Sequence, residues 1–503
     1  MSLSRRDVLR LSALAGGAVV LPVGFGLAHA EADANPSSPA FPAFTVPLPI
    51  PVDAQPVPTA DGVIHYSVDQ VVARQRILPN FPPVPVWTYN GTYPGPTFRV
   101  NSGTPVVVTQ NNRLDAASTG LAGGVATTVH PHGLDVEPGS DGHPLHLVLP
   151  GGFLEHHYPN RQRAATLWYH DHAIDHTSRN VYMGLAGFYL IADEHERSLP
   201  LPSGPFDIPL VIQDKRFNPD GTILYVSENG LPQRQGQFGD VLLVNGAPQP
   251  VLRVQQRRYR FRLLNGSDAR FYGLELSTGD PLVVIASDGG LLPHPVPTAN
   301  LFMVEAERYS VVVDFSRYPI GTRVILRNTV APVPFGDPVD PAKIRDVMAF
   351  DVVAPADPPD TSSVPADLAP APDIDPAQAV RTRLWQFNRQ GGAWAINGQQ
   401  FDGARIDATP KQGTTEIWTF QNEAGGWLHP VHVHLVEYKV LDRNGKPPRP
   451  WETGFKDVVS VGPNETVRVA MRFDSPFTGV YVMHCHNVSH EDHEMMTQFQ
   501  VVP

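Results

Sequence analysis

The chain has 503 residues but only one cysteine, Cys485. No intrachain disulfide can form, so Cys485 is a spare thiol, half of an intermolecular bridge or a metal ligand. Its immediate neighbours are His484 and His486. Because imidazoles and thiolates are soft metal ligands, we favour the ligand interpretation.

Positive charge is also scarce. Lys and Arg number 38 against 50 Asp and Glu, which gives a formal net charge of -12 at pH 7, and extended basic runs are missing. Nucleic-acid binding proteins usually carry a basic patch or stripe. We therefore expect no nucleic-acid partner.

Long apolar runs are missing after the N-terminal leader, since no later stretch approaches the ~18 apolar residues of a membrane-spanning helix. The leader itself has Arg5-Arg6, an apolar run over 11–27 and the small-residue site Ala28-His29-Ala30. This order looks like a twin-arginine signal peptide over residues 1–30. An uncleaved anchor is the alternative, but the glycines and the proline within the run argue against it. We expect no stable membrane span in the mature form, and a periplasmic or extracellular location.

Proline and glycine, with 53 and 42 residues, separate many short runs in which apolar and polar residues alternate. Two examples are Tyr-Arg-Phe-Arg-Leu at 259–263 and Val-Arg-Val-Ala-Met-Arg-Phe at 467–473. Such alternation is typical of half-buried antiparallel strands. The sequence therefore predicts an all-β chain of sandwiches.

A weak internal repeat begins at Asn90-Gly91, Asn245-Gly246 and Asn397-Gly398, with starts 155 and 152 residues apart. Each start is followed at a nearly constant offset by an arginine and an apolar residue. A period this long predicts three similar domains rather than a solenoid. We predict a signal at 1–30, an extended Pro- and Ala-rich segment at 31–58, domain one at 59–196, domain two at 197–353, a semi-rigid Pro-rich linker at 354–379 and domain three at 380–503.

Four His-x-His pairs stand out, where 20 histidines in this length would give only about one by chance. Residues two apart on a strand point to the same face, so each pair presents two imidazoles together. The predicted domains one and three hold all the pairs, which predicts a metal centre between these two domains and a spacer role for the middle domain. The pairs are His130/His132, His170/His172, His432/His434 and His484/His486.

The ligand chemistry favours copper. On a strand, Cys485 points away from its two neighbours, and His490 and Met495 follow it. A thiolate, a thioether and two imidazoles are the ligand set of an electron-transfer copper, and eight further imidazoles are too many for one ion. Two zinc sites are the inorganic alternative, but zinc has no use for a thioether. Purely structural histidines could explain one pair but not four.

The remaining histidines near these motifs lack the paired spacing. We expect surface positions, or contacts to ligands instead of metal binding, for His143, His146, His156, His157, His176 and His493.

With these motifs the chain resembles the three-domain multicopper oxidases over about residues 45–503. The four histidine segments match that family's pattern in order, as do the Asn-Gly starts and the segment 93–97, Tyr-Pro-Gly-Pro-Thr. The segments 429–438, 490–496 and 213–218 look closest to bacterial laccases of the spore-coat, bilirubin oxidase and phenoxazinone synthase group. The resemblance implies three cupredoxin-like Greek-key β-sandwich domains.

The resemblance also implies four copper ions. The type 1 copper would take His429, Cys485 and His490, with Met495 as the axial ligand and Met496 as the fallback. The type 2 copper would take His130 and His432. The two type 3 coppers would share His132, His170, His172, His434, His484 and His486. Asp141 and Glu491 are implied as a proton relay near the cluster.

The implied activity is one-electron oxidation of phenolic or aromatic amine donors at the type 1 copper, with electron transfer through Cys485 and reduction of dioxygen to water. A manganese, cuprous or bilirubin oxidase on the same scaffold stays open, although no methionine-rich run supports cuprous oxidation. The connection over 442–451 is shorter than in relatives, which leaves the donor open.

Other copper proteins fit less well. A blue-copper electron carrier would not need the eight paired histidines, a copper nitrite reductase would not need His-Cys-His with four pairs, and a non-enzymatic relative would have lost ligands. The expected partners are dioxygen and a small aromatic reductant, and we expect a monomer.

Overall fold

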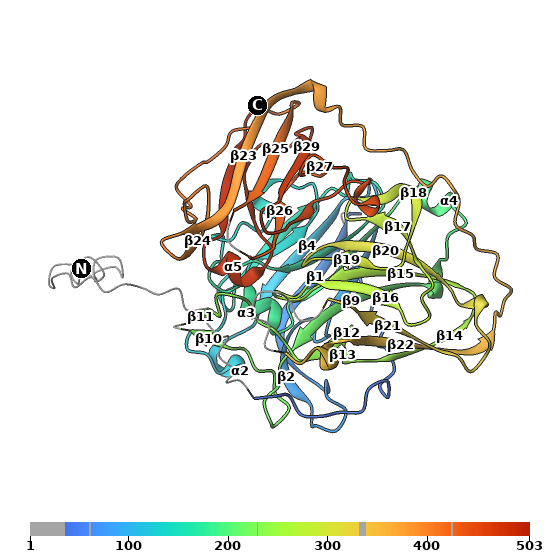
Figure 1. Ribbon diagram of the computed structural model, residues 1–503. Coiled ribbons are helices and arrows are strands. Elements are labelled where there is room, and N and C mark those ends of the chain that lie inside the picture. The colour runs from blue at the N-terminus through green and yellow to red at the C-terminus, as the bar shows by residue number, and fades with distance from the viewer. Residues whose placement is uncertain (1–35, 60–61, 229, 331–338, 424–425) are drawn as a thin grey trace, which may run out of the picture. The chain divides into compact units, whose positions relative to one another are not determined.

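The computed structural model describes residues 36–503 except 60–61, 229, 331–338 and 424–425 (Figure 1). The predicted signal at 1–30 lies outside the described residues, as does the first part of the extended segment. The described chain is built mainly of strands, which confirms the all-β prediction. None of the helices in the described part of the chain has the length and apolar character needed to span a bilayer.

The first sandwich contains the first two histidine pairs. Its sheets have the strand orders β2-β1-β4-β6 and β3-β8-β7-β5. Between them lies a core that includes Trp87, Phe98 and Leu167. The strands are β1 (Ile64–Gln75), β2 (Val84–Tyr89), β3 (Gly95–Asn101), β4 (Val106–Asn112), β5 (Val129–His132), β6 (Phe153–Tyr158), β7 (Ala165–Asp171) and β8 (Ala186–Ala192).

The middle sandwich has the strand orders β13-β12-β9-β15-β20-β17-β18 and β14-β22-β21-β16-β19, with a small hairpin β10-β11. The strands are β9 (Asp207–Lys215), β10 (Ser227–Glu228), β11 (Leu231–Pro232), β12 (Val241–Val244), β13 (Ala247–Pro248), β14 (Val251–Gln256), β15 (Arg258–Asn265), β16 (Tyr272–Leu276), β17 (Leu282–Ser287), β18 (Gly290–Thr298), β19 (Leu301–Met303), β20 (Arg308–Asp314), β21 (Arg323–Asn328) and β22 (Asp346–Pro355).

The third sandwich, orange to red in Figure 1, has the strand orders β24-β23-β25-β29-β27 and β28-β26-β30-β31. Its core includes Trp385, Trp418 and Cys485. The strands are β23 (Ala379–Gln390), β24 (Ala393–Ile396), β25 (Thr415–Asn422), β26 (His429–Val433), β27 (Tyr438–Arg443), β28 (Val458–Val461), β29 (Thr466–Arg472), β30 (Gly479–Cys485) and β31 (Met496–Val501).

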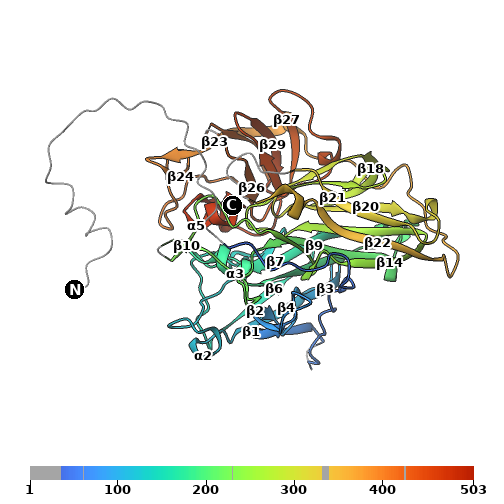
Figure 2. The ribbon, with the colours of Figure 1, turned by 60° about the horizontal axis from the view of Figure 1, so that its bottom comes forward.

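Short helices connect these strands. Helix α3 of the first sandwich and helix α5 of the third lie side by side (Figures 1 and 2). The α-helices are α2 (Ala116–Thr119), α3 (Thr177–Tyr182), α4 (Glu194–Ser198) and α5 (Val488–Asp492), and the 3-10 turns are Pro138–Ser140, Gly204–Phe206, Phe315–Arg317, Pro341–Ile344, Pro376–Gln378 and Pro450–Glu452.

The three Asn-Gly starts are equivalent in structure as well as in sequence. Asn90, Asn245 and Asn397 have φ values of 52°, 50° and 53°, and the following glycines also have positive φ. Asn and Gly are the residues that tolerate this left-handed conformation best in tight turns. Each Asn side chain accepts a hydrogen bond from a backbone N–H of a neighbouring strand, at 2.7, 2.9 and 2.7 Å. The repeat therefore reflects one turn used three times.

Strand β15 differs from the expectation of half burial. Its arginines Arg260 and Arg262 are 3 % and 4 % exposed, because the polar face of the strand packs against the first sandwich instead of water. There Arg262 donates to the hydroxyl of Thr166 on β7, and Arg260 donates to Glu196 on α4. The alternating pattern thus marks an interface between sandwiches at this strand, whereas β29 is half-buried as predicted.

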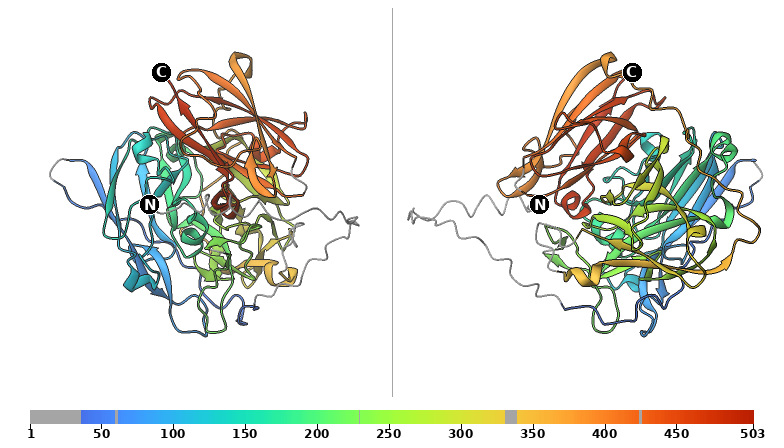
Figure 3. Two further views of the ribbon diagram at one scale, coloured as in Figure 1. Left: turned by 90° about the vertical axis from the view of Figure 1, so that its left-hand side faces the viewer. Right: turned by 45° about the vertical axis from the view of Figure 1, so that its right-hand side comes forward.

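The Pro-rich segment between β22 and β23 follows the outside of the middle sandwich (Figure 3). It is attached at several points: the N–H of Ser363 donates to Pro200 and that of Leu368 donates to Pro293. The side chain of Leu368 is buried there. The segment therefore connects the two sandwiches along a defined path.

Candidate metal centre

The four histidine pairs lie on or directly after strands of the first and third sandwiches. His130 and His132 are on β5, and His130 pairs with His170 of β7. In the third sandwich, His432 of β26 pairs with His484 of β30 in the same way. Strand pairing brings opposite residues close together on the same face. Each sandwich therefore supplies four imidazoles from two neighbouring strands.

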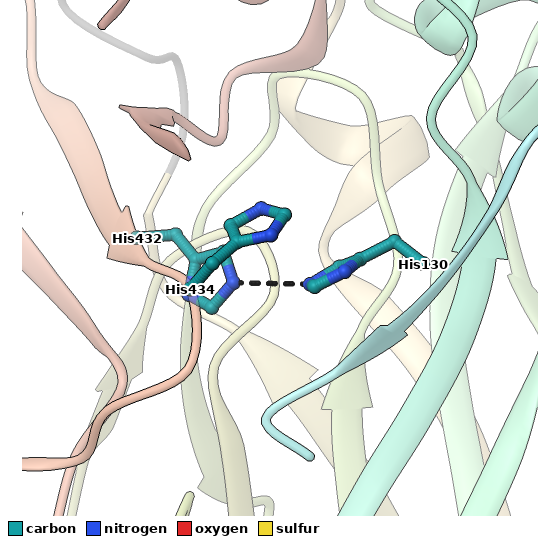
Figure 4. Close-up of side chains that lie close together, drawn as sticks. All are labelled: His130, His432 and His434. Carbon is teal, nitrogen blue, oxygen red and sulfur yellow. Dashed lines mark hydrogen bonds between the residues drawn. The ribbon is translucent and has the colours of Figure 1, made fainter. Parts of the chain in front are cut away.

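The eight paired imidazoles form three groups, and within each group the ligand atoms lie within 4.8 Å of one another. Figure 4 shows the first group, in which the ring of His130 from β5 reaches the rings of His432 and His434 from the third sandwich. Every group contains histidines from both sandwiches. The groups are His130/His432/His434, His132/His170/His486 and His172/His434/His484.

Two of these histidines have tautomers that follow from their partners. Nδ1 of His130 lies 2.6 Å from the carbonyl oxygen of Asp141, and Nδ1 of His432 lies 2.9 Å from the carbonyl oxygen of Asp457. A carbonyl oxygen only accepts, so both Nδ1 atoms carry the proton and both Nε2 atoms present lone pairs. These two Nε2 atoms face each other at 3.3 Å (Figure 4). Two facing lone pairs repel unless a cation lies between them.

Facing ring nitrogens recur in the group His172/His434/His484, and the group His132/His170/His486 holds ring nitrogens without partners in the described part of the chain. Nε2 of His484 lies 3.2 Å from Nε2 of His172 and 3.3 Å from Nε2 of His434. Nδ1 of His132 and Nε2 of His170 are buried and make no hydrogen bond to the described residues. Buried polar atoms without partners are costly and uncommon. The donor set therefore fits metal ions in all three groups.

Burial also favours the neutral form of these imidazoles. It lowers the pKa of His130, His132, His432, His434 and His486 well below the ordinary value, and neighbouring imidazoles add to the effect. Burial likewise lowers the pKa of His170 to about 3 and that of His172 to about 4. Neutral imidazole is the form that binds metal, so a metal ion can bind these rings without first removing a proton.

The single cysteine lies in a fourth, separate group. Sγ of Cys485 is 3.4 Å from Nδ1 of His429 and 3.6 Å from Nδ1 of His490, and all three residues are fully buried. Burial raises the pKa of the Cys485 thiol well above its usual range. A buried thiol of this kind is protonated without metal, and a bound metal ion would hold the thiolate.

The two methionines after this group face opposite ways. Met496 pairs with His484 across β30 and β31, so its side chain is on the face of His484 and away from Cys485. Met495 belongs to the same buried core cluster as Cys485. The register thus favours Met495 over Met496 beside the cysteine.

Asp141 reaches the histidine groups from the first sandwich. Its Oδ2 accepts from Nδ1 of His434 at 2.8 Å, and its carbonyl oxygen holds His130. The chain turns sharply after it at Gly142, where φ is 74° and a Cβ would lie 2.2 Å from the carbonyl oxygen of Val129. Burial raises the pKa of the Asp141 carboxyl well above its ordinary value.

Glu491 on α5 reaches the groups from the third sandwich. Its Oε1 is 3.3 Å from Nδ1 of His172, and its Oε2 is 3.2 Å from Nδ1 of His484. The hydroxyl of Thr177 donates to Oε1 at 2.7 Å. Burial alone would raise the pKa of Glu491, but the two imidazoles outweigh it and lower that pKa to about 2.

The sequence did not identify Asp457. This buried residue, just before β28, has Oδ1 at 3.2 Å from Nε2 of His132, and its carbonyl oxygen holds His432. The only signal was a charged pair, Lys456-Asp457, directly before the apolar run Val458-Val459. Charged residues are rarely buried without partners, so such a pair beside a buried strand could have been noticed.

The six histidines expected not to bind metal lie outside all of these groups, as far as the described residues show. His146 and His157 are exposed, and His176 and His493 are half-buried. His143 and His156 are buried, with ring nitrogens near the oxygens of Gln498 and Ser140. His143 and His156 are therefore not surface residues.

Comparisons with known proteins agree with this geometry. Two profiles described as multicopper oxidase match residues 70–196 and 373–503. The bilirubin oxidase of Albifimbria verrucaria is 40% identical over 483 residues, covering 92% of this chain and 82% of the relative. The chain belongs to the multicopper oxidase family. A laccase of Bacillus subtilis (strain 168) is 36% identical, covering 91% of this chain and 98% of that laccase.

Solved structures show the same fold for this multicopper oxidase. The crystal structure of a laccase from Pediococcus acidilactici Pa5930 has a TM-score of 0.82 and 32% identity, covering 93% of this chain and 95% of that laccase. The McoA multicopper oxidase of Aquifex aeolicus has a TM-score of 0.80 and 28% identity, covering 91% and 99% of the two chains. The three sandwiches are therefore cupredoxin-like, as predicted, and the protein is a copper-dependent oxidoreductase that uses dioxygen.

Proposed function

We propose that this multicopper oxidase is laccase-like, binds four copper ions, and oxidises phenolic or aromatic amine donors in one-electron steps. The observation that carries the proposal is the pair of contacts in which lone-pair nitrogens of the first and third sandwiches face one another, at 3.3 Å between His130 and His432 and at 3.2 Å between His172 and His484. A cluster of cations satisfies them, and the separate thiolate group suits an electron-transfer copper.

The ligand assignments follow the groups. When bound, copper at His429, Cys485, His490 and Met495 supplies one-electron oxidation, and three coppers at the eight paired histidines supply four-electron reduction of dioxygen. His130 and His432 would hold the type 2 copper. The type 3 pair would take His132, His170 and His486 on one ion and His172, His434 and His484 on the other.

Strand β30 provides the connection between the two sites. Cys485 points into the core of the third sandwich, while His484 and His486 point toward the first sandwich. The backbone of these three consecutive residues therefore links the Cys485 group, where the donor is oxidised, to the paired-histidine groups, where dioxygen is reduced, by a short covalent route. No other cysteine exists in the chain to offer a second route.

Asp141 and Glu491 are proposed to supply protons for oxygen reduction. Both carboxylates contact the Nδ1 atoms of proposed ligand imidazoles, Asp141 at His434 and Glu491 at His484. A carboxylate within hydrogen-bond reach can accept a proton as a general base and then pass it on as a general acid. Thr177 is suited to pass a proton to Glu491 because its hydroxyl donates to Oε1.

The surroundings of His429 and His490 support an aromatic donor. The ring of Trp394 lies 3.9 Å from that of His490, and the rings of Trp427 and Phe387 lie 5.6 Å from His490 and 5.9 Å from His429. Trp394 and Phe387 are buried, but Trp427 is partly exposed, so its ring can contact an aromatic donor beside His490. A manganese ion would prefer oxygen ligands. A bilirubin-like donor is the second candidate, favoured by the 40% identity to a bilirubin oxidase.

We further propose export and a monomeric state. Arg5-Arg6 and the apolar run after it support a twin-arginine signal over residues 1–30. Export of the folded protein would deliver it to the periplasm or the extracellular space. Mass spectrometry of the N-terminus of the exported protein tests cleavage after residue 30.

The central experiment combines copper analysis with oxygen uptake. Copper-loaded protein is expected to hold four coppers per chain, to be blue, and to consume dioxygen with a phenol as donor. Bilirubin and Mn(II) are tested beside the phenol, since faster uptake with either identifies the alternative. Fewer than about three coppers together with no oxygen uptake for any donor would refute the oxidase proposal.

The axial assignment has its own test. Met495→Leu should keep the blue colour and raise the reduction potential of the type 1 copper, because losing the weak thioether donor destabilises the oxidised ion. Met496→Leu is the matched control and should leave the potential unchanged. Both swaps conserve volume and should each cost less than about 1.5 kcal/mol of stability. An anaerobic redox titration of the visible band measures the potential, and a shift in Met496→Leu alone would reverse the assignment.

A further inference from the structure

The side chain of Arg308 lies where all three sandwiches meet. It begins β20 of the middle sandwich and is 0 % exposed. Its Nε donates to the carbonyl oxygen of Thr166 on β7 of the first sandwich, at 3.0 Å. Its Nη1 and Nη2 donate to the two carboxylate oxygens of Asp457 in the third sandwich, at 2.6 and 2.5 Å. One guanidinium therefore connects the strand that carries His170 to the segment that precedes β28.

Asp457 carries this connection to the histidine groups. Its Oδ1 is 3.2 Å from Nε2 of His132, and its carbonyl oxygen accepts from Nδ1 of His432. The rings of His132 and His432 stack with centroids 3.7 Å apart and an interplanar angle of 14°. Asp457, the partner of Arg308, thus contacts one histidine in each of two groups, His132 in one and His432 in the other.

The contact with Asp457 determines which nitrogen of His132 is free. A carboxylate that accepts from Nε2–H leaves Nδ1 with its lone pair, and this Nδ1 is buried without a hydrogen-bond partner among the described residues. Partners behind a metal-binding imidazole set its tautomer and ring orientation in this way. The orientation of His132 therefore depends on the orientation of the Asp457 carboxylate.

Arg308 is suited to fix that orientation. A guanidinium binds both oxygens of a carboxylate through two parallel hydrogen bonds, which fixes the plane of the carboxylate as well as its position. Its charge also compensates the buried carboxylate, which would otherwise be costly. A lysine ammonium at the same place would supply the charge without fixing the plane.

The neighbouring residue Lys456 anchors the same segment to the middle sandwich. Its Nζ is 2.9 Å from Asp288 and 2.8 Å from Glu307. It also donates to the hydroxyl of Tyr309 at 2.9 Å. The segment that carries Asp457 is therefore held by the middle sandwich at two consecutive residues.

We propose that Arg308 is a positioning residue for the oxygen-reducing copper cluster. By fixing the plane of the Asp457 carboxylate, Arg308 orients Nδ1 of His132 toward its ion. By holding the same residue in place, it also keeps the carbonyl oxygen of Asp457 against Nδ1 of His432. The middle sandwich, which contributes no paired histidine, thereby controls the geometry of the cluster. This inference rests on the proposed function, because it requires the eight paired histidines to hold copper.

The test is Arg308→Lys in the copper-loaded full chain. The variant keeps the charge but loses the bidentate hydrogen bond to Asp457, so the cluster should bind copper about 10–100-fold more weakly. Its type 2 electron paramagnetic resonance spectrum should change, while the blue type 1 absorption stays the same. The readouts are copper per chain during dialysis against a chelator, the resonance spectrum and the visible spectrum. If this variant does not fold, Asp457→Asn is the second variant, with the same expected spectral changes. Its amide keeps one oxygen for Arg308 but cannot accept two parallel hydrogen bonds, and the Arg308 charge stays beside Asp288.

Arg262→Lys is the matched control. Arg262 is also buried in the middle sandwich, donates to the hydroxyl of the same Thr166 at 3.1 Å and binds Asp207 through two nitrogens. It contacts a carboxylate that does not touch the histidine groups. Arg262→Lys should therefore lower thermal stability without changing the type 2 spectrum.

The outcomes separate this inference from the proposed function. If the parent protein lacks the cluster copper, the proposed function fails. If the parent has it and Arg308→Lys matches Arg262→Lys in type 2 spectrum and copper retention, the positioning role is overturned. Parallel loss of type 1 and cluster copper would also overturn the positioning role, because such a loss would show that the whole structure is weakened.

Discussion

Cys485→Ser is expected to abolish the blue colour and lower turnover by more than about 100-fold. Residues behind a metal ligand already contribute about 10–100-fold, and Cys485 is a proposed ligand itself. A serine hydroxyl is a harder and less acidic donor than a thiol, so it cannot replace the thiolate beside His429 and His490. The measurements are the visible spectrum and oxygen uptake with a phenol.

The cluster coppers should remain in Cys485→Ser. His484 and His486 point away from the cysteine, toward the first sandwich, so a change at Cys485 leaves their side chains in place. The type 2 resonance spectrum should therefore persist, and the buried hydroxyl should cost about 1–3 kcal/mol of folding stability. Met495→Leu serves as the control that keeps the thiolate and the colour. Parental turnover in a colourless Cys485→Ser protein would refute the proposed electron route.

Glu491→Gln is expected to lower turnover by about 10²–10⁴-fold. The amide keeps the size of the side chain but cannot hold or deliver the proton as a carboxyl does. Only the oxygen-reducing half of the reaction needs that proton. A stopped-flow experiment should therefore show a normal rate of anaerobic bleaching by the donor and slow return of colour when oxygen is admitted.

Asp492→Asn is the matched control for this experiment. Asp492 is the next residue on α5 and is equally buried, but its carboxylate accepts from the backbone N–H groups of Thr177 and Ser178. Its replacement should affect folding stability more than oxygen reduction. Glu491 has no role in proton supply if Glu491→Gln reoxidises at the parental rate.

Much of the site could be predicted from the sequence because its ligands are close together along single strands. A spacing of two residues places both imidazoles on one face, and His484-Cys485-His486 necessarily divides its side chains between two faces. The strand pairings His130 with His170 and His432 with His484 then bring the pairs together. Local strand geometry was enough to predict the faces of these side chains, whereas the structure supplied the strand pairings.

Other contacts could not be predicted because they join distant parts of the chain. Asp457 is 325 residues from His132 and 149 residues from Arg308. Nothing in the local pattern around Arg308 distinguishes it from other alternating strand residues. The same holds for Arg260 and Arg262, whose pattern predicted a solvent-facing side although a second sandwich covers it.

The sequence by itself determined which ligand types are present, how they divide between strand faces and that the outer two sandwiches carry them. The tertiary structure alone decided which ring nitrogens are free. The carbonyl oxygens of Asp141 and Asp457 and the carboxylate of Asp457 set the protonated nitrogen of His130, His432 and His132. The physical reason is that an imidazole has two nearly equivalent nitrogens, and only a partner brought from elsewhere in the fold makes them different.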